Sequence, residues 1–221
     1  MGAPLRIDFV SDVACPWCVV GLRSLLKAID AVGDKVDVQI HFQPFELNPD
    51  MAAEGENTTE HVQKKYGSTP ERSAAARQAL KDSGAALGFD FNYSPQSRIW
   101  NTFDAHRLLH WAGIEGKQLE LKEALFRVNF TEQQSTSDHE VLAKAAESAG
   151  LDGKRAREIL KSGEFTKEVR SEEMVWRNRG ISAVPSVIFN QRWMIQGGQP
   201  PQVFEQAIRQ IVEGTAQEER A

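Results

Sequence analysis

The chain has 221 residues, and its 26 Lys and Arg residues against 31 Asp and Glu residues give a formal net charge of −5. Hydrophobic residues make up 41% and charged residues 26%, which is typical of a folded globular protein and excludes a disordered tail. The acidic balance argues against a nucleic-acid-binding surface, and no apolar run approaches the roughly 20 residues of a membrane-spanning helix. The N-terminus shows no signal-peptide pattern, so we expect a location in the reducing cytoplasm.

A strand, a helix and a second strand are predicted in the first 44 residues. Leu5, Ile7 and Phe9 alternate with other residues, which indicates a buried strand ending near residue 10. Residues 36–42 alternate strictly between apolar and polar side chains, which predicts a second strand with one buried face. Between these strands, apolar residues recur at helical spacing until Gly33 ends the helix. The pattern is a βαβ unit.

The two cysteines of the chain, Cys15 and Cys18, stand where the first strand meets the helix. One Cys-x-x-Cys pair beside a βαβ unit predicts a redox site. With Pro16 as the first helical residue, the helix N-terminus favours an anion, so we expect the pKa of the Cys15 thiol to lie below the ordinary value of about 8.5. Cys18, one turn further along, is expected to be the buried resolving thiol. The alternative is that both are unreactive core cysteines.

The middle of the chain, residues 48–179, is predicted to be a helical insertion. Apolar residues at helical spacing predict helices over 58–66, 70–83, 119–130, 138–149, 152–160 and 164–178. A further helix, capped by Asn101 or Thr102, carries an apolar stripe from Ala105 to Ala112. Ser94 and Pro95 are expected to break the chain before it.

The C-terminal part returns to β-structure. Residues 183–189 are predicted to form a strand with Pro185 near its start, and residues 193–195 its hairpin partner. A closing helix begins at Pro201, and the polar residues 214–221 are expected to fray. The predicted fold is therefore α/β and thioredoxin-like, βαβ followed by ββα, with a large helical insertion. We expect residues 1–47 and 180–214 to form the thioredoxin-like domain and residues 48–179 the insertion domain.

Five sequence blocks spread in order over nearly the whole chain carry a family resemblance. They are SDVACPWC at 11–18, PFEL at 44–47, NTFDAHRL at 101–108, GISAVPS at 180–186 and GGQP at 197–200. With these blocks the chain resembles the DsbA-like thioredoxin proteins of the FrnE branch, relatives of 2-hydroxychromene-2-carboxylate isomerase and kappa-class glutathione transferase. The resemblance implies that Pro185 is a cis-proline facing the cysteines, with the Val184 backbone turned toward a substrate strand. The alternative is a trans proline that starts an edge strand.

The resemblance implies a thiol–disulfide oxidoreductase that reduces, forms or isomerises disulfides. Cys15, Cys18 and Pro185 are then the catalytic residues, and a Cys15–Cys18 disulfide takes the place of a bound cofactor. The expected partners are disulfide-containing proteins or small molecules, with glutathione or a dithiol as reductant, and kinship suggests a homodimer. A glutathione-dependent isomerase or transferase acting on a small aromatic molecule is the rival enzyme, although those relatives typically carry a serine in place of Cys15. A binding or chaperone-like module with idle cysteines is the rival without catalysis.

Further residues are predicted to contact the substrate or move a proton. Pro16, Trp17 and Val184 are expected to bind the substrate next to Cys15. Asn101 and His106 are also assigned to substrate binding, although a solvated helix face is the alternative for His106.

Glu46 is the candidate proton acceptor for Cys18 if burial raises the pKa of its carboxyl, and an exposed loop-entry residue otherwise. His106 and His110 are four residues apart, but no further ligands accompany them, so no metal site is expected.

Overall fold

The computed structural model describes residues 2–218, with side chains described up to residue 214. Its main sheet has four strands in the order β2-β1-β5-β6. β1 pairs in parallel with β2, as a βαβ unit requires, and antiparallel with β5, which forms a hairpin with β6. The strands are β1 (Ala3–Ser11), β2 (Val36–Pro44), β5 (Ser186–Phe189) and β6 (Trp193–Gln196). The predicted thioredoxin-like order of elements is confirmed.

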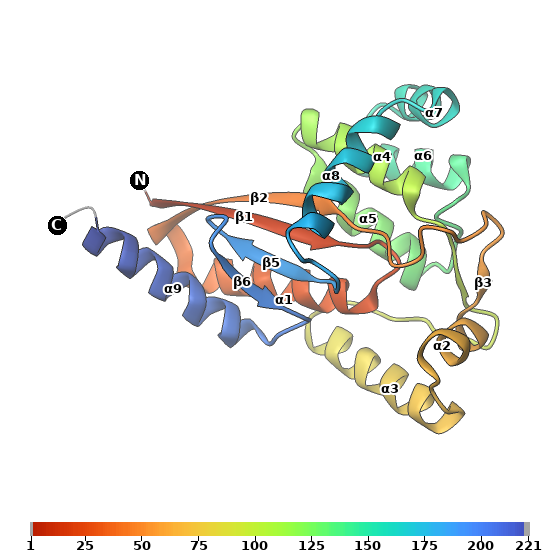
Figure 1. The fold of residues 1–221 in the computed structure, drawn as a ribbon, viewed down its shortest axis with the longest axis horizontal. Coiled ribbons are helices and arrows are strands. Elements are labelled where there is room, and N and C mark those ends of the chain that lie inside the picture. The colour runs from red at the N-terminus through yellow and green to blue at the C-terminus, as the bar shows by residue number, and fades with distance from the viewer. Residues whose placement is uncertain (1, 219–221) are drawn as a thin grey trace.

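One face of the sheet is covered by α1 (Pro16–Val32) and α9 (Pro201–Glu218), which lie side by side in Figure 1. Ile7 and Phe9 of β1 belong to the core on this side, together with Phe204 of α9. Gly33, at φ +66°, ends α1 as predicted. α9 continues beyond residue 214, where fraying was expected, because the following residues include good helix formers; residues 219–221 lie outside the described residues.

The opposite face of the sheet packs against the end of the insertion. Val10 of β1 and Ile188 of β5 contact Trp176 of α8 (Thr166–Asn178) there, since successive side chains of a strand point to opposite faces. The predicted helices of the insertion are all present: α2 (Thr58–Tyr66), α3 (Pro70–Ala86), α4 (Phe103–Ile114), α5 (Gln118–Phe130), α6 (His139–Ser148) and α7 (Gly153–Ser162), besides α8.

The helices of the insertion form two groups. α4 to α7 share a core of their own, built around Leu108, Leu121 and Leu142. α2 and α3 stand apart from this group, and the end of α3 lies against α1, where Lys27 donates to the Ala86 carbonyl (Figure 1). Phe91 and Phe130 of the insertion pack into the main core, so the insertion is not packed independently of the sheet. The division of the chain into domains at residues 47 and 180 stays a prediction.

Two local expectations differ from the structure. The strand predicted from residue 183 begins only at Ser186, because Pro185 has no N–H to donate to a neighbouring strand. A two-stranded sheet of β3 (Glu56–Asn57) and β4 (Arg98–Ile99) was not predicted, since strands of two residues leave no alternating pattern. It joins the segments on either side of α2 and α3.

Candidate active site

Cys15 is the residue that precedes the first turn of α1, and Pro16 occupies the first helical position. The Cys15 N–H donates to the Asp12 carbonyl at 3.2 Å, and its carbonyl accepts from the Cys18 N–H at 3.0 Å. The first turn of α1 holds no acidic residue, so the N–H groups of the helix end face the reactive position without competition. Cys15 is 4% exposed and Cys18 is fully buried, and both are free thiols.

The Val184–Pro185 segment closes the site from the C-terminal part of the chain. The peptide bond between these residues is cis, as expected, and the Cys15 Sγ lies 3.5 Å from the Val184 carbonyl oxygen. α1 approaches this segment closely because Gly21 has no side chain, since a Cβ there would lie 2.9 Å from Pro185 Cγ. The structure thus brings Cys15, Cys18, Val184 and Pro185 together from positions about 170 residues apart.

The two thiols differ in electrostatic environment. Burial raises the pKa of Cys18 well above its ordinary value, and the hydrogen bond and charge of Cys15 raise it further. The positive charge of Lys122 acts in the opposite direction. Burial therefore keeps Cys18 a neutral thiol, and a negative charge on Cys15 adds to this effect.

Lys122 of α5 is a cation buried behind the dithiol, with an exposed fraction of 1%. Burial lowers the pKa of its ammonium to about 8, although the neighbouring acidic groups of Cys18, Asp12 and Cys15 act to raise it. Its Nζ lies 5.0 Å from the centre of the Phe126 ring. A group with such a pKa exchanges a proton readily near neutral pH.

Asp12 is the buried anion on the same side. Its carboxylate accepts hydrogen bonds from the Ala14 N–H (3.1 Å), the Leu47 N–H (2.7 Å) and the Thr102 hydroxyl (2.8 Å), and it lies 3.6 Å from His106 Nε2. Burial works to raise the pKa of Asp12, but His106 and these hydrogen bonds outweigh burial and lower it. Asp12 therefore stays ionised and ties the segment after β2 to the cysteine loop and to α4.

Asn101 and His106 are close to this charge cluster but are not among the residues that line the pocket beside Cys15. Asn101 caps α4 by accepting from the Phe103 N–H at 2.9 Å. His106 is 2% exposed, so the solvated helix face considered for it is wrong; its ring faces Asp12 because α4 packs against the end of β2. Their assignment to substrate binding stays a prediction.

Glu46 is buried, with an exposed fraction of 1%, so the alternative of an exposed loop-entry residue is wrong. Its carboxylate and that of Glu173 share one guanidinium nitrogen of Arg170, which lies 2.8 Å from the Glu173 oxygen. Burial and the charge of Glu173 raise the pKa of Glu46 to about 7, against the effect of Arg170. The groups acting on Glu46 belong to α8 and include neither cysteine, so its role as proton acceptor for Cys18 stays a prediction.

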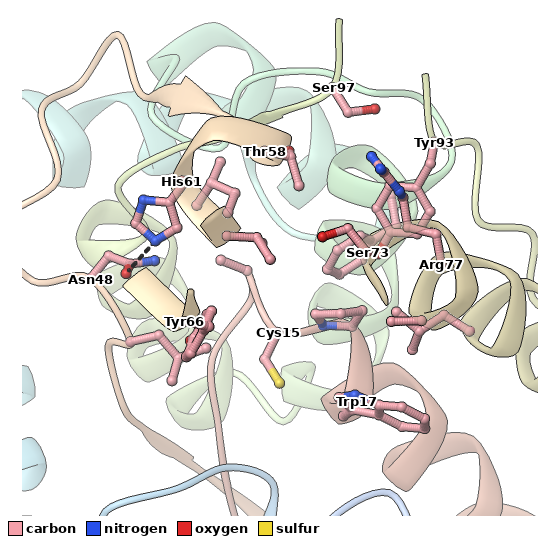
Figure 2. Close-up of a pocket in the computed structure, with 18 of the residues that line it drawn as sticks. Cys15, Trp17, Asn48, Thr58, His61, Tyr66, Ser73, Arg77, Tyr93 and Ser97 are labelled. Atoms are coloured by element: carbon pink, nitrogen blue, oxygen red, sulfur yellow. Dashed lines mark hydrogen bonds between the residues drawn. The ribbon is translucent and has the colours of Figure 1, made fainter. Parts of the chain in front are cut away.

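A pocket of about 530 Å³ opens beside Cys15 (Figure 2). Pro16, Trp17 and Val184, which the sequence assigned to substrate binding, line it. Trp17 is 42% exposed and forms an apolar edge next to the sulfur. The remaining wall comes largely from α2, α3 and the segment that follows α3, and includes His61, Tyr66, Arg77, Leu80, Tyr93 and Phe130.

Sequence analysis missed these wall residues. α3 shows weak amphipathic patterning, and few side chains of α2 and α3 are buried, so nothing marked a functional face. Tyr93 nevertheless interacts electrostatically with the site. Burial and the charge of Cys15 raise the pKa of the Tyr93 phenol, and the charge of Arg77 lowers it. His61 Nδ1 lies 2.6 Å from a Glu56 oxygen, which fixes the ring at the pocket wall.

Among residues 2–218, no group of three or more His, Cys, Asp or Glu side chains is placed to hold a metal ion. His110 instead faces Glu172, with 3.1 Å between the ring nitrogen and the carboxylate, and this contact raises the pKa of His110. No helix in the described part of the chain combines the length and apolar character needed to cross a membrane.

Residues 6–209 match the family model described as a DSBA-like thioredoxin domain. A probable DsbA oxidoreductase from Streptomyces coelicolor is 33% identical, and its crystal structure superposes with a TM-score of 0.89 over 95% of this chain and 90% of that chain. The uncharacterized protein YwbO of Bacillus subtilis is 27% identical over 206 residues, or 92% of this chain and 96% of that protein. The predicted resemblance to DsbA-like thioredoxin proteins and the thioredoxin-like fold are confirmed.

A more distant likeness concerns the fold alone. The cytosolic disulfide reductase DsbM of Pseudomonas aeruginosa, in a structure with GSH, is 15% identical, with a TM-score of 0.61 over 94% of this chain and 99% of that chain.

Proposed function

Because the chain belongs to the DSBA-like thioredoxin domain family, we propose that it is a thiol–disulfide oxidoreductase whose reacting groups are Cys15 and Cys18. The observation that carries this proposal is the 3.5 Å contact between the Cys15 Sγ and the Val184 carbonyl, at the start of α1 and with Cys18 buried one turn away. This arrangement gives one thiol access to the substrate and reserves the other for the second step.

The reaction proceeds by two exchanges. The Cys15 thiolate attacks one sulfur of a substrate disulfide; that S–S bond breaks, and the first product leaves as a thiolate that takes up a proton. The remaining half stays bonded to Cys15, beside the Val184 carbonyl. Cys18 then loses its proton and attacks the Cys15 sulfur, which releases the second product thiol. The two thiols have then given two electrons to the substrate and are joined as the Cys15–Cys18 disulfide.

The buried groups behind the dithiol assist the second exchange. Bond formation at Cys15 removes a negative charge that raises the pKa of Cys18, and the Lys122 ammonium stabilises the Cys18 thiolate as it forms. Glu46, with a pKa raised to about 7, is the candidate to accept the proton, and Asp12 holds the cysteine loop in place.

Two molecules of glutathione, or one dithiol, reduce the oxidised enzyme, and the same steps in reverse oxidise a substrate dithiol. We place the protein in the cytosol, where glutathione is abundant, and the structure of DsbM with GSH supports glutathione as the electron donor. Either direction of electron flow is compatible with the chemistry, and a homodimer is expected from the family.

The experiment that tests this function is a redox equilibrium in glutathione buffers. Thiols are trapped by alkylation, and the protein is weighed by mass spectrometry. A two-electron transition that joins Cys15 to Cys18 is expected, together with insulin-reducing activity that Cys15→Ser abolishes. Full insulin reduction by Cys15→Ser, or the absence of an intramolecular disulfide at every glutathione ratio, would overturn the proposal.

One observation favours a second candidate. The pocket beside Cys15 is largely apolar and has a volume suited to a small ligand, which also fits a glutathione-dependent isomerase or transferase acting on a small aromatic molecule. That enzyme binds glutathione saturably and does not need a resolving thiol. Glutathione-dependent turnover that survives Cys18→Ser, with only a glutathione adduct on Cys15, would establish this candidate instead.

A further inference from the structure

The pocket beside Cys15 differs in charge from the rest of the chain. The chain carries an excess of five acidic residues, but no Asp or Glu is among the described residues that line this pocket. Its fixed positive charges are Arg77 and Arg98. The charge of the wall therefore favours a ligand with a negative group over a neutral or positive one.

The two arginines differ in what already satisfies them. The Arg98 guanidinium donates to the carbonyl oxygens of Glu54 and Gly55, with two bonds of 2.8 Å and one of 3.2 Å. Arg77 donates from Nη1 to the Thr59 hydroxyl at 3.0 Å, and the ion pairs found among residues 2–218 include none with Arg77. Since a guanidinium has five N–H donors, Arg77 has capacity for a ligand carboxylate.

Arg77 also has the right position. It lines both the pocket and a second, more open hollow of about 370 Å³, where Lys81 adds another positive charge. In Figure 2 its guanidinium lies near Tyr93, on the side of the pocket away from Cys15. The wall of the pocket also carries apolar side chains, among them Val62, Leu80 and Phe130.

We propose that Arg77 makes the enzyme selective for low-molecular-weight disulfides that carry a carboxylate. This inference rests on the proposed function and adds the class of substrate to it. In the first exchange the disulfide sulfur meets Cys15 and the carboxylate binds the Arg77 guanidinium. The half that stays bonded to Cys15 keeps this contact while Cys18 attacks. A pocket of this size, walled by α2 and α3, suits a small molecule.

Three small disulfides with different charges test the proposal: dithiodipropionic acid, which is anionic, bis(2-hydroxyethyl) disulfide, which is neutral, and cystamine, which is cationic. Reduced enzyme is mixed with an excess of each disulfide, and the rate of Cys15–Cys18 disulfide formation is followed by alkylation and mass spectrometry. For each disulfide, the rate measured with wild type is divided by the rate measured with Arg77→Gln, so that the intrinsic reactivity of the disulfide cancels.

The ratio of wild type to Arg77→Gln is expected to be about tenfold for the anionic disulfide, the effect of losing one charge-assisted hydrogen bond. It is expected to stay within about twofold for the neutral one. Arg77→Lys should recover part of the rate with the anionic disulfide. Arg72→Gln, which removes the same charge from an exposed position on α3 outside the pocket wall, serves as the matched control.

Equal ratios for all three disulfides would overturn the role of Arg77, and so would an anionic preference retained in Arg77→Gln or lost equally in Arg72→Gln. These outcomes leave the proposed function intact, because the internal disulfide still forms. If wild type forms no Cys15–Cys18 disulfide with any of the three, the proposed function fails instead.

Discussion

On the pocket side of Cys15, the groups that face a substrate are aromatic rings, short side chains and arginines, many of them partly exposed. On the other side, around Cys18, the groups are ionisable and almost completely buried: Asp12, His106 and Lys122 are each no more than 2% exposed. Residues on the pocket side can be substituted with little loss of stability, whereas a buried charge is stable only while its partners remain in place. Substitutions on the two sides should therefore have separable effects.

The largest effect is expected from Asp12→Ala. This change removes the acceptor of three hydrogen bonds and one of the buried acidic groups that act on Lys122, so we expect a loss of about 4 kcal/mol in the free energy of unfolding. Urea denaturation measures it. Asp152→Ala, which removes an exposed cap at the start of α7, should lose only about 1 kcal/mol. Equal losses for the two variants would contradict the contrast between buried and exposed sites.

Glu46→Gln is expected to change how stability depends on pH. The pKa of Glu46 is raised in the folded state from 4.5 to about 7, so its contribution is fully present below pH 4.5 and is lost as the pH rises through 7. Between pH 5 and pH 8, wild type should lose about 2 kcal/mol relative to Glu46→Gln. Urea denaturation at both pH values checks this, with exposed Glu60→Gln as control. The same pH dependence of stability in wild type and Glu46→Gln would exclude this contribution of Glu46.

Lys122→Met should slow the attack by Cys18 without blocking the first exchange. Removing the positive charge disfavours the Cys18 thiolate, and one unit in its pKa corresponds to about a tenfold lower rate at neutral pH. Release of the second product thiol, followed by stopped flow from pH 6 to pH 9, measures this step. Its pH profile should move to higher pH in Lys122→Met and stay near wild type in Lys122→Arg. If both variants slow the step equally, Lys122 has a packing role only.

Trp17→Ala is expected to have the smallest effect on stability. Trp17 is 42% exposed at the pocket edge, so its removal should change the free energy of unfolding by no more than about 1 kcal/mol while weakening reaction with small disulfides. Trp176→Ala on the other face of the sheet is the matched comparison. That ring is 5% exposed and donates to Gln43, and its loss should destabilise by about 4 kcal/mol. A large destabilisation by Trp17→Ala would contradict the expectation that substitutions on the pocket side have little effect on stability.

Local sequence patterns predicted most of the fold. The alternation at Leu5, Ile7 and Phe9 and the helical spacing after Cys18 are properties of neighbouring residues, so the βαβ unit could be found without tertiary information. The helices of the insertion followed in the same way, with ends that differ by a few residues. The cis bond at Pro185 was implied by the family resemblance and not by any local pattern.

What the sequence by itself determined was the pair of cysteines at a helix start, the succession of strands and helices, and the Val184–Pro185 segment near the closing hairpin. Only the tertiary structure decided which groups surround the dithiol. Lys122 is one polar residue in a helix whose pattern says nothing of Asp12, more than 100 residues earlier, and Arg77 lies on a helix of weak amphipathic character. The physical reason is that periodicity records which face of an element is buried, whereas a buried charge is stabilised by partners that the fold brings from distant parts of the chain.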